Sequence, residues 1–227
     1  MSDKLRKWRL ISALPDERIR QLENQVTWRT YKRGDRLFNE GETDGKMYVI
    51  ASGRVKVVKE FPNGKNAIMG IFGPGGAVAE IVGIDRLPYP ASAIAMEDTE
   101  AGAIPGEVFA VFLKSNPDAM LRMIVGLGNK LREFADNLGS LAVQSVEKRL
   151  ARFLVRMSSQ IGKKTKEGIE VNLPMTRQDL AEVIGTSFEV VERSLKKMRE
   201  NGVLKVEGKN ITILELEKLK AIFGETE

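Results

Sequence analysis

Residues 176–202 read TRQDLAEVIGTSFEVVERSLKKMRENG, and this stretch decides the fold of the C-terminal part of the chain. Thr176, with Asp179 three residues later, predicts a capping box at the start of one helix. Gly185 predicts the end of that helix, and a second helix is expected from Phe188. Apolar side chains at helical spacing join the two helices: Leu180, Ala181, Ile184, Val190, Val191 and Leu195. The stretch therefore predicts a helix-turn-helix in which one face of the second helix stays free.

Two charged residues lie on this free face. Glu189 and Arg193 are four residues apart, so they are neighbours near the start of the second helix. In a DNA major groove a carboxylate can accept a hydrogen bond from cytosine N4, and a guanidinium can donate two bonds to guanine O6 and N7. The pair is therefore predicted to read one G·C base pair. The alternative is an ordinary surface ion pair, worth roughly a few tenths of a kcal/mol.

A short hairpin is predicted after the second helix. Alternating strands at 203–206 and 210–214 flank the turn Glu207-Gly208-Lys209, which would complete a winged helix-turn-helix. Four residues around this motif are predicted to hold DNA phosphates, contacts that position a protein without reading sequence. They are Arg177, Gln178, Ser187 and Lys196. For each of them, a solvated surface side chain is the alternative.

A long amphipathic helix is predicted ahead of this motif, starting at Asn116-Pro117-Asp118. Its apolar residues are spaced alternately by four and three, which gives three heptads of a coiled-coil seam. They are Met120, Ile124, Leu127, Leu131, Phe134, Leu138 and Leu141. So narrow a stripe favours a seam between two copies of the chain, with packing inside one chain as the alternative.

Short apolar and β-branched runs fill the region from Val26 to Ile104, with glycines recurring between them. This cadence is typical of an antiparallel barrel or roll, and Asn63-Gly64 is a hairpin signal within it. Helical spacing in residues 1–30 predicts a short helical cap. The fold class is thus expected to be α+β, with a roll domain over 1–115, a long helix over 116–142 and a winged domain over 143–227.

Composition excludes several classes of function. The 227 residues include no cysteine and no histidine, which removes disulfides, thiolate zinc sites, iron–sulfur clusters held by cysteine and catalytic triads. No metal site is predicted. The opening residues lack a signal-peptide core and no segment approaches about 18 consecutive apolar residues, so we expect a cytoplasmic protein without membrane contact. Residues 142–199 hold 12 Lys and Arg against 7 Asp and Glu, so the net charge of +5 is local to this stretch.

With these motifs identified, the sequence resembles the cyclic-AMP receptor and fumarate–nitrate reduction regulator superfamily of bacterial transcription factors. The resemblance runs from about Leu14 to Phe223. It is carried by Lys32-Arg33-Gly34-Asp35, Glu40-Gly41, Ser52-Gly53, Asn63-Gly64, Asn116-Pro117-Asp118 and the stretch from Thr176 to Arg193. The resemblance implies an N-terminal antiparallel β-roll like the cyclic-nucleotide-binding jelly roll, a long dimerisation helix and a C-terminal winged helix-turn-helix that binds DNA.

The resemblance also implies roles for three residues of the second helix. Glu189 and Arg193 stand at the family's base-reading positions, and Phe188 stands where cyclic-AMP receptors have a further arginine. In having an apolar residue at this position, the sequence is more similar to the fumarate–nitrate branch. It implies a palindrome with TTGA-like half-sites, in which the ring contacts a thymine methyl group.

The implied effector pocket departs from the cyclic-nucleotide branch. Its residues are Ala79, Glu80, Ala91, Ser92 and Phe134. In that branch an arginine clamps the phosphate where Ala91 stands here, and a Thr-Ser pair contacts adenine where Phe134-Ala135 stands. A buried cyclic phosphate without the guanidinium would lose its bidentate partner, so cyclic AMP is not expected. Substitution by Arg86 is the alternative.

Other effectors stay open. The pattern at Ala79-Glu80 and at 89–93 is more similar to a branch that responds to nitric oxide and redox conditions, some of whose members are thought to use haem. Haem could be held here through Met, Tyr or Lys, although the methionines fit core positions better. A small apolar ligand, or no ligand at all, are the alternatives, so the cofactor is left unassigned.

The leading hypothesis is a homodimeric DNA-binding regulator whose roll senses an effector and whose long helices place two recognition helices about one DNA turn apart. The expected partners are double-stranded DNA, a second copy of the chain and RNA polymerase, with the loop 163–166 as either a polymerase contact or a solvated loop. One alternative is a ligand-sensing roll whose C-terminal domain docks a protein, and another is a regulator active without ligand. An enzyme using Glu80 or Asp85 with a metal lacks a convergent acid, base and nucleophile.

Overall fold

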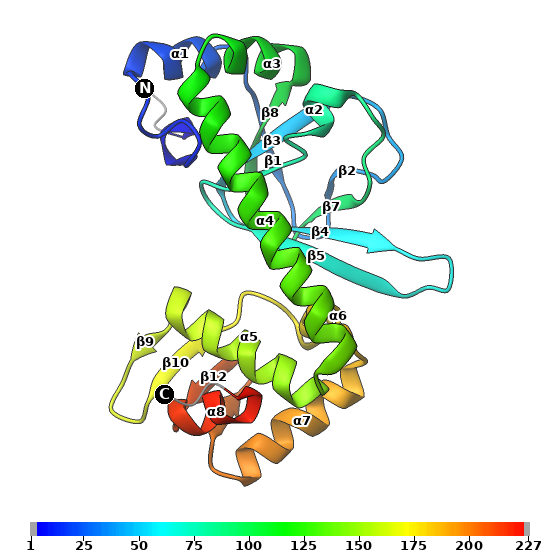
Figure 1. The fold of residues 1–227 in the computed structure, drawn as a ribbon, viewed down its shortest axis with the longest axis vertical. Helices are drawn as coiled ribbons and strands as arrows, with labels where there is room; N and C mark the ends of the chain where they lie inside the picture. Colours follow the sequence, from blue (N-terminus) through cyan, green and yellow to red (C-terminus); the bar gives the residue numbers. More distant parts are fainter. Residues whose placement is uncertain (1–3, 225–227) are drawn as a thin grey trace. The chain divides into compact units, whose positions relative to one another are not determined.

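A computed structural model describes residues 4–224, with the side chains at 133, 136–138 and 140–143 outside the described set. The chain divides into two compact units, Met1–Leu131 and Arg132–Glu227 (Figure 1). The division falls inside the long helix α4 (Pro117–Val143), whose limits lie close to the range expected from the heptad pattern. The three-part division at 115 and 142 stays a prediction.

The first unit contains the expected β-roll, built from two four-stranded antiparallel sheets (Figure 1). One sheet has the order β1 (Thr27–Tyr31), β8 (Thr99–Pro105), β3 (Lys46–Ser52) and β6 (Ala77–Val78). The other has the order β2 (Arg36–Phe38), β7 (Ser92–Ala95), β4 (Val55–Glu60) and β5 (Asn66–Phe72). The predicted hairpin is confirmed, because β4 pairs with β5 and Gly64 takes a positive φ of 76° in the turn.

Aromatic rings fill the interior of the roll. Phe38 stacks on Tyr89 with 4.0 Å between ring centroids. The Tyr48 ring lies 5.5 Å from the Phe38 ring, centroid to centroid, and the two ring planes are tilted by 31°. The Tyr89 hydroxyl is bound by Asp44 and by the backbone of Lys46, and burial raises the pKa of this hydroxyl. Aromatic side chains therefore occupy the space between the sheets, and the polar end of Tyr89 is satisfied there.

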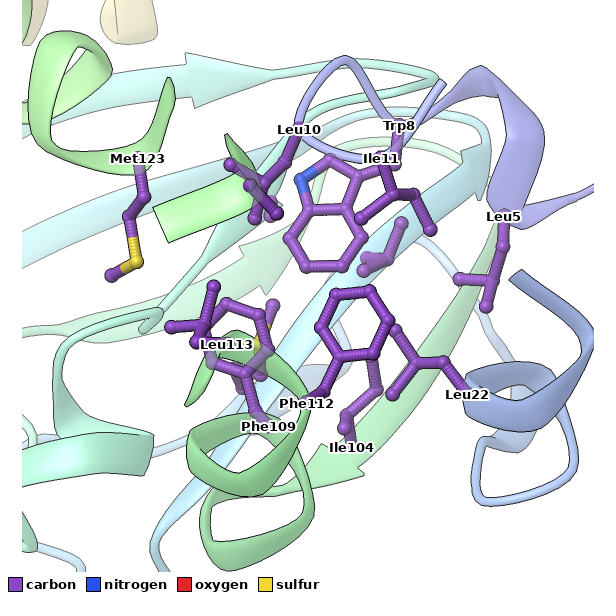
Figure 2. Packing of buried hydrophobic residues seen from close by; sticks show 14 of the residues in the cluster. Leu5, Trp8, Leu10, Ile11, Leu22, Ile104, Phe109, Phe112, Leu113 and Met123 are labelled. Carbon is purple, nitrogen blue, oxygen red and sulfur yellow. The ribbon is translucent and has the colours of Figure 1, made fainter. Parts of the chain in front are cut away.

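A second apolar cluster lies where the helical cap meets the roll (Figure 2). The expected cap consists of the 3₁₀ turn η1 (Leu5–Lys7) and the helix α1 (Asp16–Glu23), and α3 (Gly106–Lys114) packs beside them. Trp8 meets Phe109 of α3 with 5.6 Å between ring centroids. Met123 of α4 is buried in the same cluster, so the start of α4 is fixed to the roll.

Two glycines hold α2 (Val82–Asp85) directly against α3. A Cβ on Gly106 would overlap the Gly83 carbonyl, and a Cβ on Gly83 would lie 3.2 Å from Cα of Gly106. The two backbones thus approach each other with no side chain between them, a distance that only glycine permits.

The second unit contains the expected winged helix-turn-helix. Its helices are α5 (Val146–Ile161), α6 (Arg177–Ile184), α7 (Phe188–Glu200) and α8 (Leu216–Phe223). Its four-stranded sheet has the order β11 (Leu204–Glu207), β12 (Asn210–Ile213), β10 (Ile169–Asn172) and β9 (Lys163–Lys164). The predicted wing is the β11–β12 hairpin. The helix α8 is an element that the sequence patterns did not predict.

The predicted capping box is confirmed. Asp179 N donates to Thr176 Oγ1 at 3.1 Å, and Thr176 N donates to Asp179 Oδ2 at 2.9 Å. Gly185 ends α6 with a left-handed φ of 73°, as the sequence predicted. These local signals fix the turn between α6 and α7.

Across residues 4–224, every helix is too short or too polar to traverse a lipid bilayer.

Gly106→Ala is expected to lower the free energy of unfolding by about 3 kcal/mol, because the added methyl group must push α2 away from α3. Gly126→Ala is the matched control: it lies inside α4, where an added Cβ meets nothing within 4 Å. We expect that variant to gain about 0.5–1 kcal/mol from helix propensity. Urea unfolding of both variants measures the difference, and equal midpoints would contradict the tight contact.

Candidate nucleic-acid interface

The recognition helix α7 has one buried and one exposed face. Val191, Leu195 and Met198 are buried within the second unit. Glu189 and Arg193 are exposed, and Phe188 is 41% exposed at the first turn. The three predicted base-reading residues therefore share the solvent-facing part of one helix.

Glu189 is held at the N-terminal end of α7. The Ser187 side chain and the Glu189 backbone amide favour the ionised carboxylate, so the pKa of the Glu189 carboxyl group is lowered. The positive end of the helix dipole favours the same ionised form. At neutral pH Glu189 therefore presents a hydrogen-bond acceptor.

A groove of about 430 Å³ runs beside the exposed face of α7 and reaches the wing. It is lined by Glu192, Arg193, Leu195, Lys196, Arg199 and Val206. Three of these residues are cationic. The groove can thus receive a polyanion along the helix that carries Arg193.

The predicted phosphate-binding residues differ in their surroundings. Gln178, Ser187 and Lys196 are exposed, and Lys196 lies 3.8 Å from Glu200 of its own helix. The side chain of Arg177 is only 18% exposed. Its Nη2 donates to the Gly208 carbonyl in the wing at 2.7 Å, and its Nε lies 3.6 Å from Glu192. In this structure Arg177 therefore joins α6 to the wing and to α7, so its predicted phosphate contact would require an exchange of partners.

Arg149 of α5 has a place in this interface that no sequence pattern indicated. Its guanidinium donates to the carbonyls of Ile184 and Gly185 at the turn before α7 and to the carbonyl of Gln144. The acceptors are backbone carbonyl oxygens. Because every residue has one, the sequence gives no sign of which carbonyls Arg149 will bind.

The predicted seam on α4 is largely exposed within the chain. Ile124 is 59% exposed, Leu131 69% and Phe134 45%, and Met120 is also exposed. Leu127 instead packs against the core of the first unit. Leu138 and Leu141 lie outside the described side chains. The alternative of internal packing therefore applies at Leu127, while the other described seam residues keep apolar surface in water.

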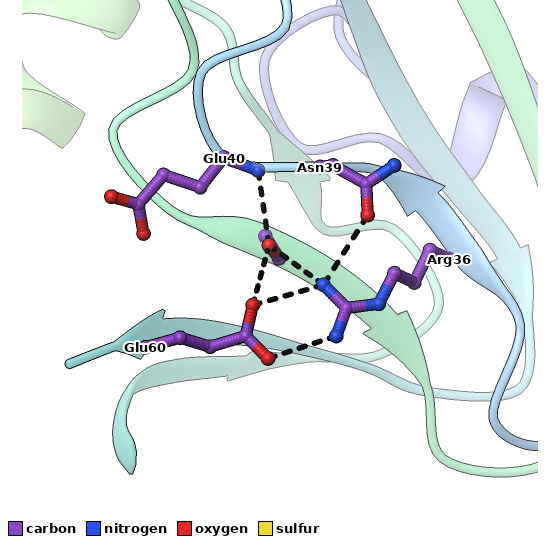
Figure 3. A network of polar contacts seen from close by, with 5 residues as sticks. Arg36, Asn39, Glu40 and Glu60 are labelled. Carbon is purple, nitrogen blue, oxygen red and sulfur yellow. Dashed lines mark hydrogen bonds and ion pairs between the residues drawn. The ribbon is translucent and has the colours of Figure 1, made fainter. Parts of the chain in front are cut away.

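A polar network on the roll includes Arg36, Asn39, Glu40 and Glu60 (Figure 3). Ser92, one of the predicted pocket residues, takes part in it. Arg36 Nη1 and the backbone amide of Glu40 each donate to its hydroxyl at 3.0 Å. Glu60 holds Arg36 through two hydrogen bonds of 2.8 and 3.0 Å. Because side chains alternate along a strand, Ser92 faces away from the interior that Ala93 lines.

The other predicted pocket residues are divided among several places. Ala79 has a φ of 61°, which is uncommon outside glycine. The Glu80 carboxylate lies 2.8 Å from Lys130 Nζ on α4, and Ala91 is buried. Phe134 belongs to the second unit and is described apart from them. The five residues remain a predicted pocket.

Two family models match the chain, one in each half. The model described as "Cyclic nucleotide-binding domain" matches residues 28–116, which include the roll. The model described as "Crp-like helix-turn-helix domain" matches residues 148–222, which include α6, α7 and the wing. Both halves therefore have independent family matches.

Known proteins match over nearly the whole chain. The CRP-like cAMP-activated global transcriptional regulator of Mycobacterium tuberculosis is 25% identical over 219 residues, covering 96% of this chain and 98% of that protein. The fumarate and nitrate reduction regulatory protein of Salmonella typhimurium is 27% identical over 218 residues, covering 94% and 86%. A CooA mutant from Carboxydothermus hydrogenoformans has the same fold, with a TM-score of 0.78 at 23% identity over 88% of this chain and 89% of that chain.

The relatives are divided between the cyclic-AMP and the fumarate–nitrate branches, so they do not assign the chain to either. A cyclic nucleotide-binding-like roll followed by a Crp-like helix-turn-helix defines the common architecture, and the family consists of transcription factors rather than enzymes. With a cyclic nucleotide-binding domain ahead of a Crp-like helix-turn-helix domain, the chain has the domain composition of a CRP/FNR-type DNA-binding transcriptional regulator.

Proposed function

We propose that the chain acts in the cytoplasm as a homodimer whose two recognition helices read a palindrome with TTGA-like half-sites. The observation that carries this proposal is the shared exposed face of Glu189, Arg193 and Phe188 beside a cationic groove. An acceptor and a bidentate donor on one helix suit a G·C pair, and the Phe188 ring suits a thymine methyl group. RNA polymerase is the partner through which such a regulator acts.

The exposed seam on α4 supports the dimer. In a single chain, large apolar side chains on α4 would stay in contact with water, namely Ile124, Leu131 and Phe134. A second α4 packed against them would remove this surface and would set the separation of the two recognition helices. The effector-sensing roll is fixed to the start of the same helix through Met123, so a change in the roll can bias the seam.

For the effector, we propose a molecule other than cyclic AMP. Ala91 offers no charge to a cyclic phosphate. The Glu80 carboxylate is already paired with Lys130, and aromatic rings occupy the roll interior. An absorption spectrum of protein purified with haem available, followed by a nitric oxide titration, tests the haem hypothesis directly.

Arg193→Ala is expected to relax discrimination at one G·C pair and to cost about 1–3 kcal/mol of specific binding. The operator is first selected by the wild-type chain from random DNA, and affinities are then measured for all four bases at each position. Lys196→Ala is the matched control on the same helix, expected to weaken all sequences alike and to reduce the salt slope by about one. Uniform weakening by Arg193→Ala would make Arg193 a phosphate contact instead.

Leu131→Glu or Phe134→Glu is expected to give monomers with weak operator affinity, because a buried carboxylate in the seam has no partner. Sedimentation equilibrium measures the state of assembly. Val111→Glu is the control, since Val111 is 63% exposed on α3 and lies outside the seam. Dimers that survive both seam substitutions would reject the assignment of the interface.

Calorimetric titration with cyclic AMP is expected to give no saturable binding, because the bidentate cation for the phosphate is absent at position 91. The operator affinity should likewise be unchanged when the nucleotide is added. Stoichiometric binding that raises operator affinity would place the chain functionally with the cyclic-AMP receptors.

A further inference from the structure

Arg149 joins two segments of the second unit that are far apart in sequence. Its Nη1 donates to the Gln144 carbonyl at 2.8 Å. Its Nε donates to the Ile184 carbonyl at 3.0 Å, and its Nη2 donates to the Gly185 carbonyl at 3.4 Å. One planar group thus binds three backbone oxygens.

The three acceptors have specific positions in the fold. Gln144 lies in the two-residue link between the end of α4 and the start of α5. Ile184 and Gly185 are at the C-terminal end of α6, where backbone carbonyls lack partners within the helix and favour a cation. Burial lowers the pKa of the Arg149 guanidinium, yet an arginine stays charged at any physiological pH.

The turn held by Arg149 leads directly into the recognition helix. Only Thr186 and Ser187 separate Gly185 from the first residue of α7. A separate ion pair joins α5 to α7, because Lys197 of α7 donates to both carboxylate oxygens of Glu147 on α5, at 2.9 and 3.1 Å. The start of α5 is therefore attached once to the turn before α7 and once to α7 itself.

From this geometry we propose that Arg149 is a positioning residue that makes the link after α4 and the turn before α7 move as one body. The inference rests on the proposed homodimer, in which α4 sets the separation of the two DNA-binding units. Without Arg149 the link can bend independently of the turn. The two recognition helices then sample several separations. The dimer is no longer preorganised for a palindrome with one spacing, so its affinity for that palindrome falls.

The test compares the wild-type chain with Arg149→Ala on three DNA probes: the selected palindrome, the same palindrome with one base pair added or removed between half-sites, and a single half-site. We expect Arg149→Ala to bind the palindrome about tenfold more weakly, because the variant loses charge-assisted hydrogen bonds. Half-site affinity and thermal midpoint should stay close to wild type. The preference for one spacing should flatten, and a merely structural role would leave that preference intact.

Two further variants serve as controls for the charge and the shape of the Arg149 side chain. Lys148→Ala removes one exposed positive charge at the neighbouring position, and it should keep the wild-type spacing preference. Arg149→Lys keeps the charge without the planar fork, and it should behave like the alanine variant.

Three results would overturn the proposal. Equal losses on half-site and palindrome would indicate a structural role alone. A salt slope reduced by about one would indicate a phosphate contact. An unchanged spacing preference in Arg149→Ala would show that the link and the turn are coupled by other contacts. A wild-type chain that selects no palindrome would instead contradict the proposed function, independently of Arg149.

Discussion

Burial of one face of α7 is the constraint on which the DNA-binding surface depends. Val191, Leu195 and Met198 remove apolar area from water, and the rotation of the helix is thereby fixed. With that rotation fixed, residues at 189 and 193 must face solvent whatever their chemistry. The helix could present any pair of side chains there, so the fold alone does not determine which chemical groups these two exposed positions offer.

The sequence predicted those parts of the molecule that rest on local patterns. The capping box at Thr176, the αL glycine at 185, the wing hairpin and the heptad spacing of α4 each depend on residues a few positions apart. The contacts of Arg177 and Arg149 were beyond prediction, because their acceptors are backbone carbonyls brought close only by the tertiary fold. The contacts of Ser92 were beyond prediction for a related reason: Arg36 and Glu60, which engage its hydroxyl, are 56 and 32 residues away in sequence, and its place in a ligand pocket stays a prediction.

Arg177 illustrates how one side chain can serve two requirements. A cation next to a DNA backbone gains from phosphate contact, while a guanidinium between α6, α7 and the wing gains from fixed carbonyl and carboxylate partners. Its low exposure means that the second set of contacts is present before any DNA arrives. The wing is thus held in place by the protein itself, and DNA binding need not order it.

The backbone contact between Gly83 and Gly106 limits how α2 and α3 can move relative to each other. Side chains at most interfaces are compliant and absorb small displacements by changing rotamer. Here two main chains touch directly, so α2 and α3 have no side-chain layer between them at Gly83 and Gly106. Ser115 and Asn116 join α3 to α4, and the Asn116 side-chain amide donates to the Phe112 carbonyl at 2.8 Å. A displacement of α2 toward α3 would therefore have to be met by movement of the α3 backbone, because no side chain between them can change its rotamer.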